Sequence, residues 1–190
     1  MSAARDRITP AQRSALDKLA PVLPSACYLA GGVAGGVTAV LPDLEQLPGV
    51  GITNRAAGTV YLSVDGVPVS LIQYRYPPVS PPARLAGLPI DVASLDDLVC
   101  MKLSAIAGRG AARDFWDLHA MIEVGERPLG EVIAVFRRKH PAVDIGHLVR
   151  SLAYFGDADA EPLPLGLTVE HWARIRDDFA AWITELLTME

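Results

Sequence analysis

The segment 94–119 constrains the fold of this chain most, because charged and apolar residues recur in it at helical spacing on both sides of one glycine break. Ser94 suits the N-cap of a helix, and Asp97 suits the acidic third position of a capping box. We therefore predict a helix from Leu95 to about Ala107, which ends at Gly108 because glycine commonly terminates helices.

Two cations border the apolar face of this helix. The apolar stripe consists of Leu95, Val99, Leu103 and Ile106. Lys102 and Arg109 are seven residues apart, which places them on one side of the helix and about 10 Å apart along its axis. A charge at the edge of a buried stripe needs a partner or a cleft, because burying it alone is costly. The alternative is that the aliphatic stems pack while the charged ends reach water.

A second helix is expected to open near residue 111 or 112. Its apolar ridge is formed by Phe115, Leu118 and Ile122. Asp114 and Asp117 are three residues apart in its first turns and share one side. Acidic residues near a helix N-terminus are favoured by the helix dipole whatever the function, so a site and a purely helical role both remain open. His119 follows one turn after Phe115 and is interpreted as lining the core.

The remaining patterns predict a small sheet followed by a helical half. Before Ser94 we expect a helix up to about Leu19, a short strand at 26–30, a hairpin around Asp65 and Gly66, and a last strand at 89–93. Pro68 places the second hairpin strand at a sheet edge. Helices are then expected at roughly 94–107, 112–124, 128–139, 144–154 and 168–188, with a surface loop at 156–166. The prediction is an α+β fold in two parts, residues 1–93 and 94–190.

Composition limits the classes of protein that fit. A chain of 190 residues with 51% apolar residues can bury a sizeable core. No apolar run approaches the ~20 residues of a membrane span and no signal peptide is recognisable, so we expect a cytoplasmic protein without a membrane partner. The net charge of −5 argues against binding nucleic acid through overall charge. Cys27 and Cys100 lack metal-ligand spacing and are expected to be buried, reduced thiols.

Several segments resemble one protein family. The pattern DL-x-x-MKLSA-x-AGRG-x-ARDFWDL at 97–118 is similar to the C-terminal signature of the AbiEii-type nucleotidyltransferases, toxins of type IV toxin–antitoxin and phage-defence systems. Three further segments resemble that family in order and spacing: CYLAGG at 27–32, VDGVPVSLIQYRYPPVSPP at 64–82 and LVRSLAYFGDADAEPLP at 148–164. The resemblance implies a polymerase-β-like nucleotidyltransferase core that transfers a nucleotide from a nucleoside triphosphate to an acceptor.

The resemblance also implies roles, a cofactor and partners. Lys102 and Arg109 would bind the triphosphate, the arginine as a fork and the lysine as a point charge. Asp114 and Asp117 resemble the last acidic motif of the family, and would orient the two cations or activate the acceptor hydroxyl. Mg²⁺ is the implied cofactor. The implied partners are a nucleoside triphosphate, an RNA acceptor such as tRNA or a protein acceptor, and a cognate antitoxin.

The glycine-rich segment departs from the family pattern. Gly31 and Gly32 match the family's strand-to-helix turn, where glycines let a helix N-terminus approach a phosphate; a tight turn with positive φ would use the same residues. Family members continue with a helix and then a strand that carries an Asp-x-Asp pair for divalent metals. The segment 31–49 reads GGVAGGVTAVLPDLEQLPG and contains no such pair. Its duplicated GGVA/GGVT is consistent with a natural deletion, an engineered one, or a segment left out of the record.

Two other acids are the weak candidates for a replacement metal pair. Asp43 and Glu45 would point to one face if they lay on a strand, as two-metal transfer requires. Pro42 and the LEQL that follows favour a short helix with solvated acids instead. Ser70 lies where such folds often carry a third acid, and its hydroxyl is a poor substitute for a carboxylate.

Two alternative functions therefore stand beside the enzyme. One is a catalytically degenerate homologue that binds a nucleotide or an antitoxin without turnover. The other is a helical interaction domain with no nucleotide site. An Asp-x-Asp pair after Gly32 in the source gene would discriminate between them and the enzyme.

Overall fold

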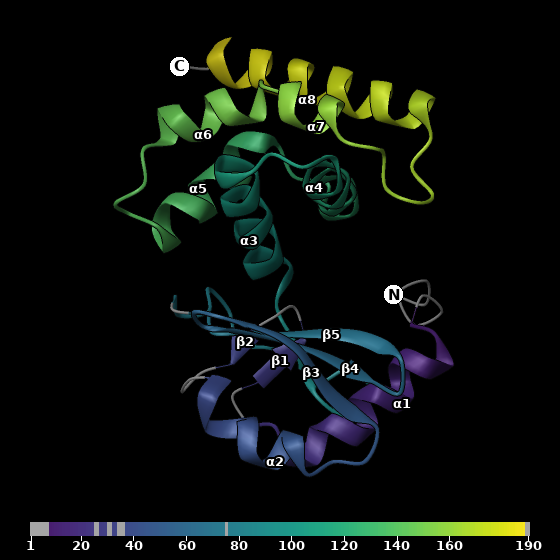
Figure 1. Ribbon diagram of the computed structural model, residues 1–190. Coiled ribbons are helices and arrows are strands. Elements are labelled where there is room, and N and C mark those ends of the chain that lie inside the picture. Colours follow the sequence, from purple (N-terminus) through teal and green to yellow (C-terminus); the bar gives the residue numbers. More distant parts are fainter. Residues whose placement is uncertain (1–7, 25–26, 30–31, 34–36, 75, 189–190) are drawn as a thin grey trace. The chain divides into compact units, whose positions relative to one another are not determined.

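The chain divides into two compact units, Met1–Ala93 and Ser94–Glu190. The computed structural model describes residues 8–24, 27–29, 32–33, 37–74 and 76–188. Figure 1 shows the elements of both units. The fold is mixed α/β, with strands in the first unit and helices alone among the described elements of the second, as the sequence predicted.

The first unit contains two three-stranded sheets. One has the strand order β2-β1-β6, in which β1 pairs antiparallel with β2 and parallel with β6. The other is an antiparallel meander in the order β3-β4-β5. The elements are α1 (Pro10–Leu19), the 3-10 turn η2 (Ala20–Val22), β1 (Cys27–Leu29), β2 (Gly32–Val33), the 3-10 turn η3 (Val37–Val40), α2 (Leu41–Glu45), β3 (Val50–Ala56), β4 (Thr59–Val64), β5 (Val67–Ile72) and β6 (Asp91–Val92).

The predicted hairpin is formed by β4 and β5. Asp65 and Gly66 adopt φ values of 48° and 83°, the positive values that a two-residue turn of this kind requires. Pro68 lies on β5, an edge strand, so its missing amide hydrogen removes no bond from the centre of the sheet. The buried face of the meander packs into a core formed by Ala15, Leu19, Cys27, Val40, Leu44, Val60, Leu62, Val64 and Leu71.

The observed structure at Gly32 differs from the predicted strand-to-helix turn. Gly31 lies outside the described residues. Gly32 begins β2, which runs back antiparallel along β1 with Tyr28 opposite Gly32 and Cys27 opposite Val33. The backbone at Gly32 is therefore in a strand ladder and does not begin a helix.

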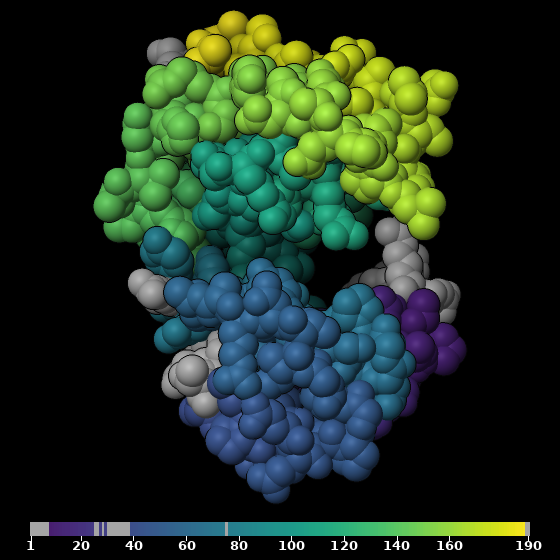
Figure 2. Space-filling model, in the orientation of Figure 1, coloured from purple at the N-terminus to yellow at the C-terminus, as the bar shows by residue number. Residues whose placement is uncertain are grey.

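The second unit is built around α3. The helices are α3 (Leu95–Gly108), α4 (Ala112–Gly125), α5 (Leu129–Lys139), α6 (Ile145–Leu152), α7 (Gly156–Ala160) and α8 (Val169–Thr188). α3 packs against α4, α5 and α6, and α8 packs against the same three helices. Side chains fill the spaces between the helices on the face that Figure 2 shows. None of the helices in the described ranges is long and apolar enough to cross a membrane.

The segment 156–166, predicted as a loop, contains the short helix α7. Ala158 on α7 is fully buried, and Asp159 accepts a hydrogen bond of 2.7 Å from the indole nitrogen of Trp172 on α8. These tertiary contacts, which have no local sequence signature, order a segment rich in acidic residues and proline. Both cysteines are buried and free, as predicted. Burial raises the pKa of the Cys100 thiol to about 11, so this thiol is protonated at neutral pH.

Candidate functional site

The candidate site lies where α3 ends and α4 begins. α3 ends at Gly108, and Arg109 occupies its C-cap. Gly110 has a φ of 57°, a value that favours glycine, and it lets the chain reverse within a few residues. Ala111 then caps α4 without a side-chain hydrogen bond. This short connection places the first turn of α4 beside the last turns of α3.

Asp114 is the centre of the site. Its side chain is completely buried, and its carboxylate accepts hydrogen bonds from Arg109 Nε at 2.7 Å and Arg109 Nη2 at 3.0 Å. Lys102 Nζ donates a third hydrogen bond to Asp114 Oδ1, at 3.2 Å. The two parallel bonds from the guanidinium fix its orientation as well as its position, since both atoms of the fork are engaged.

Asp117 completes the cluster from the next turn of α4. Lys102 Nζ lies 2.5 Å from Asp117 Oδ2, so the ammonium bridges both carboxylates. The Asp117 side chain is 39% exposed, whereas Asp114 has no exposed surface. The structure thus brings together the four residues that helical spacing singled out, and it gives the two acids different surroundings.

The two cations are held at the border of the core. The side chain of Lys102 is 23% exposed and that of Arg109 is 66% exposed. Lys102 does not reach freely into water, because two carboxylates engage its ammonium. Arg109 is anchored at one edge by Asp114 while most of its surface stays open to solvent.

The pKa of Asp114 is set by burial, which raises it, and by the two cations, which lower it. Burial raises the pKa of this carboxyl, but the hydrogen bond from Arg109 and the charge of Lys102 outweigh burial, and the net pKa lies below the ordinary value of 3.8. Asp114 is therefore ionised at neutral pH. An ionised, fully bonded carboxylate acts here as a positioning group for the two cations.

The two weak metal candidates lie on a short helix and not on a strand. Asp43 lies in the first turn of α2, and Glu45 Oε1 is 2.5 Å from Arg55 Nη2 on β3. Ser70 is exposed on the edge strand β5. Asp114 and Asp117 are both bonded to Lys102. Mg²⁺ takes near-octahedral oxygen coordination and is usually held by one or two carboxylates together with substrate phosphates and water, whereas Glu45, Asp114 and Asp117 are each engaged by a Lys or Arg side chain.

Sequence reasoning missed a buried ion pair that supports the same helix. The carboxylate of Asp97 accepts hydrogen bonds from the ammonium of Lys139 and from the hydroxyl of Ser94, the latter at 2.6 Å. The Asp97 and Lys139 side chains are both almost fully buried. The pair ties the start of α3 to the end of α5. Asp97 could be assigned locally, as a capping residue, but no local pattern links it to a lysine 42 residues away.

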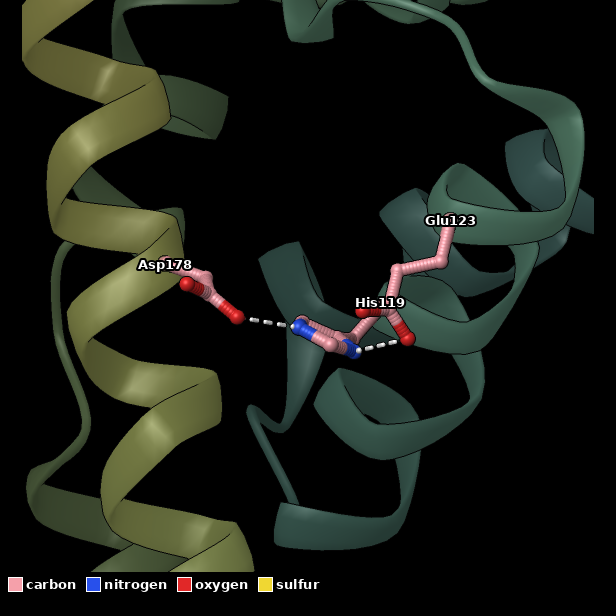
Figure 3. A group of neighbouring side chains, drawn as sticks. All are labelled: His119, Glu123 and Asp178. Atoms are coloured by element: carbon pink, nitrogen blue, oxygen red, sulfur yellow. Dashed lines mark hydrogen bonds and ion pairs between the residues drawn. The ribbon is translucent and has the colours of Figure 1, made fainter.

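His119 lines the core, as predicted, and lies between two carboxylates. Figure 3 shows Asp178 of α8 and Glu123 of α4 at opposite edges of the imidazole ring. His119 Nε2 is 2.7 Å from Asp178 Oδ2, and Nδ1 is 3.4 Å from Glu123 Oε2. The ring stacks on Trp182 with centroids 5.2 Å apart. This arrangement joins α4 to α8.

Among the described residues, His119, Glu123 and Asp178 are the one histidine and carboxylate group close enough together to hold a metal ion. In Figure 3 the two carboxylates lie at opposite edges of the ring, each beside a different ring nitrogen. Arg174 also lies 3.7 Å from Glu123 and 4.0 Å from Asp178, and it supplies these acids with a cation. These contacts link α4 to α8.

Comparison with known proteins identifies the family. The family model described as nucleotidyl transferase AbiEii toxin, type IV TA system, matches residues 38–190. A protein of Aquifex aeolicus (strain VF5), described as uncharacterized protein aq_aa25, is 30% identical over 151 residues, which cover 76% of this chain and 69% of that protein. No solved structure matches the chain. Because the family match spans well over half of the sequence and includes the whole α3–α4 cluster, the chain belongs to the AbiEii family of nucleotidyl transferase toxins of type IV toxin–antitoxin systems.

Proposed function

We propose that the α3–α4 cluster is the phosphate-handling part of a nucleotidyltransferase that moves a nucleotide from a nucleoside triphosphate to an RNA or protein acceptor. The observation that carries the proposal is the convergence of Lys102 and Arg109 on the buried carboxylate of Asp114. A pair of cations held by a buried, ionised acid is preorganised. Such groups stabilise developing charge without reorganising during the reaction.

Lys102 is the residue placed to bind the triphosphate as a point charge. An ammonium has three N–H donors, and two of them face Asp114 and Asp117. Within the described residues Lys102 has no other partner, so one donor is open to a phosphate oxygen. Arg109 adds a delocalised charge whose exposed edge can bind a second oxygen.

The two acids would divide the remaining tasks. Asp114 is buried and bonded to both cations, so it is proposed as a positioning residue. Asp117 is partly exposed and can reach an acceptor hydroxyl. In the transfer step the acceptor oxygen attacks the α-phosphorus, the bond to the β-phosphate breaks, and pyrophosphate leaves with the bonding electrons. The hydroxyl proton passes to Asp117, whose carboxylate accepts it as a general base.

The implied Mg²⁺ enters no step of this mechanism, because Glu45, Asp114 and Asp117 are each paired with a Lys or Arg side chain. When bound, such an ion neutralises the phosphate charge during transfer. The steps above use only the side chains of α3 and α4.

The second candidate is a degenerate homologue that binds nucleotide or an antitoxin without turnover. It is favoured by the position of Asp43 and Glu45, which lie on a short helix, with Glu45 paired to Arg55, and do not form a metal pair on a strand. The cluster itself has two cations and two acids, so its own charge sums to zero.

An incorporation assay separates the two functions. The protein is incubated with Mg²⁺ and each of the four nucleoside triphosphates labelled at the α-phosphate, once with total tRNA and once with the cognate antitoxin. Label that appears on either acceptor supports the transferase and names the donor and the acceptor. Labelling of neither acceptor, together with saturable binding of a nucleotide, would favour the degenerate homologue and contradict the transferase.

A further inference from the structure

An open groove lies on the helical unit next to the candidate site. Its volume is about 440 Å³, and it runs between the end of α3 and the helices α6 and α7. Its walls include Gly108, Arg109, His147, Arg150, Tyr154 and Asp157. The mechanism proposed above uses only Arg109 of these residues.

We propose that this groove is a nucleotide subsite, in which a base stacks on Tyr154 while Arg150 and the exposed edge of Arg109 hold phosphate. The inference rests on the proposed function for its role in the reaction. The groove itself combines the two components that proteins use to bind single nucleotides: cations for the backbone and an aromatic face for the base.

The two arginines of the groove are largely exposed. The Arg150 side chain is 73% exposed, and its nearest acid is Asp144 at 3.6 Å, which is also exposed. Such a surface pair contributes little, so a phosphate can compete with Asp144 for the guanidinium. Arg109, on the opposite wall, is anchored through Asp114 with most of its side chain in solvent.

The aromatic part is the exposed ring of Tyr154, which lies close to Gly156. The side chain of Tyr154 is 59% exposed. Its ring lies over Gly156, where an added Cβ would come 2.4 Å from the Tyr154 oxygen and 2.6 Å from the ring carbon that bears it. The ring occupies the space that any other residue at 156 would fill. Gly156 therefore sets the position of the proposed stacking face.

The shape of the groove depends on two further contacts. His147 Nε2 lies 3.2 Å from the carbonyl oxygen of Ala107, which ties α6 to α3 across the floor. Gly108 forms part of that floor, and an added Cβ there would meet nothing within 4 Å. Asp157 at the rim is an acceptor for a ribose hydroxyl or a base amino group.

Two nucleotides share this chemistry, the donor triphosphate and the terminal nucleotide of an RNA acceptor. Two probes distinguish them: a fluorescent tetraribonucleotide with a 5′-hydroxyl, and a fluorescent ATP or GTP. Both are titrated by anisotropy in EDTA, so that no turnover is needed.

Three variants alter the groove. Tyr154→Ala removes the ring, Gly108→Leu fills the groove from its floor, and Gly156→Ala displaces the ring. Arg137→Ala removes an exposed arginine from α5 as the matched control.

Tyr154→Ala is expected to lower the affinity for one probe about 5- to 150-fold, the loss that corresponds to one base stack. Gly108→Leu and Gly156→Ala should lower the affinity for the same probe, and Arg137→Ala should leave it unchanged. Loss of tetranucleotide binding alone assigns the groove to the acceptor, and loss of triphosphate binding alone assigns it to the donor. In a salt titration with the tetranucleotide, Arg150→Ala should lower the slope by about 0.7, the value for one phosphate contact on a single strand.

The inference fails if all groove variants bind both probes as the wild type does, or if Arg137→Ala weakens binding as much as Tyr154→Ala. It also fails if the wild type binds neither probe. These outcomes are independent of catalysis. A chain that binds the probe through the groove but transfers no nucleotide would contradict the proposed function and leave the subsite in place.

Discussion

The carboxylate of Asp114 accepts hydrogen bonds of 2.7 and 3.0 Å from the guanidinium of Arg109, while 66% of that arginine side chain stays exposed. A buried acid therefore fixes a cation whose side chain is largely exposed. The same acid also accepts a hydrogen bond from Lys102. The stability of the helical unit and the proposed phosphate site should both depend on this one carboxylate.

Replacing the two acids of the cluster by their amides should have unequal effects on stability. Asp114→Asn removes the charge from a buried group with three bonds, and we expect a loss of about 1–3 kcal/mol in the free energy of unfolding. Asp117→Asn affects a partly exposed pair, and we expect a loss of about 0–1 kcal/mol. Urea denaturation at pH 7 measures both. Equal losses would show that burial of Asp114 contributes nothing.

Stability should fall in acid partly through Asp114. The folded pKa of this carboxyl lies below the ordinary value of 3.8. Its contribution is therefore present above about pH 4 and is lost as the pH falls through the folded pKa. Free energies of unfolding measured from pH 7 to pH 3 should decline less steeply at the acid end for Asp114→Asn than for the wild type. Parallel curves would contradict the lowered pKa.

Replacing one member of the buried pair of Asp97 and Lys139 should lower the free energy of unfolding more than replacing both members. Lys139→Met leaves a buried carboxylate without its cation, and a loss of about 3–5 kcal/mol is expected. The double variant Asp97→Leu with Lys139→Met removes both charges and should recover much of that loss. A double-mutant cycle by chemical denaturation tests the coupling. Additive losses would mean that the two groups do not interact.

Mg²⁺ should bind the nucleotide-free protein weakly and without saturation at a tight site. The reason is that Glu45, Asp114 and Asp117 are each paired with a Lys or Arg side chain, and this ion favours sites completed by substrate phosphates. Isothermal calorimetry in the absence of nucleotide measures the binding. A tight, saturable site would contradict the expectation and bring Asp43 and Glu45 back into consideration.

Local patterns made the helices and the candidate cluster predictable. Lys102, Arg109, Asp114 and Asp117 lie within 16 residues, on two helices whose ends are marked by a serine cap and by glycines, so helical spacing alone places them together. The hairpin was predictable for the same reason, because Asp65 and Gly66 specify a turn through their own backbone preferences.

Contacts between distant segments were not predictable. The strand β3 was missed because its sequence, VGITNRA, is mostly exposed and shows no clear alternation. The pairing of Asp97 with Lys139 and that of His119 with Asp178 join residues 42 and 59 positions apart, and each depends on how the helices pack. The helix α7 likewise depends on the buried Ala158 and on Trp172 from α8. Single-sequence periodicity does not contain such information.

The rate of nucleotide transfer by Lys102→Ala, relative to the wild type, tests the proposed site most directly. Removing the ammonium deletes a preorganised charge, and the rate should fall about 10²- to 10³-fold. Arg113→Ala, which removes an exposed cation from the same helix as Asp114, should transfer nucleotide at the wild-type rate. Circular dichroism and the urea midpoint confirm that both variants are folded. Equal transfer by Lys102→Ala and the wild type would contradict the assignment of the α3–α4 cluster as the catalytic site.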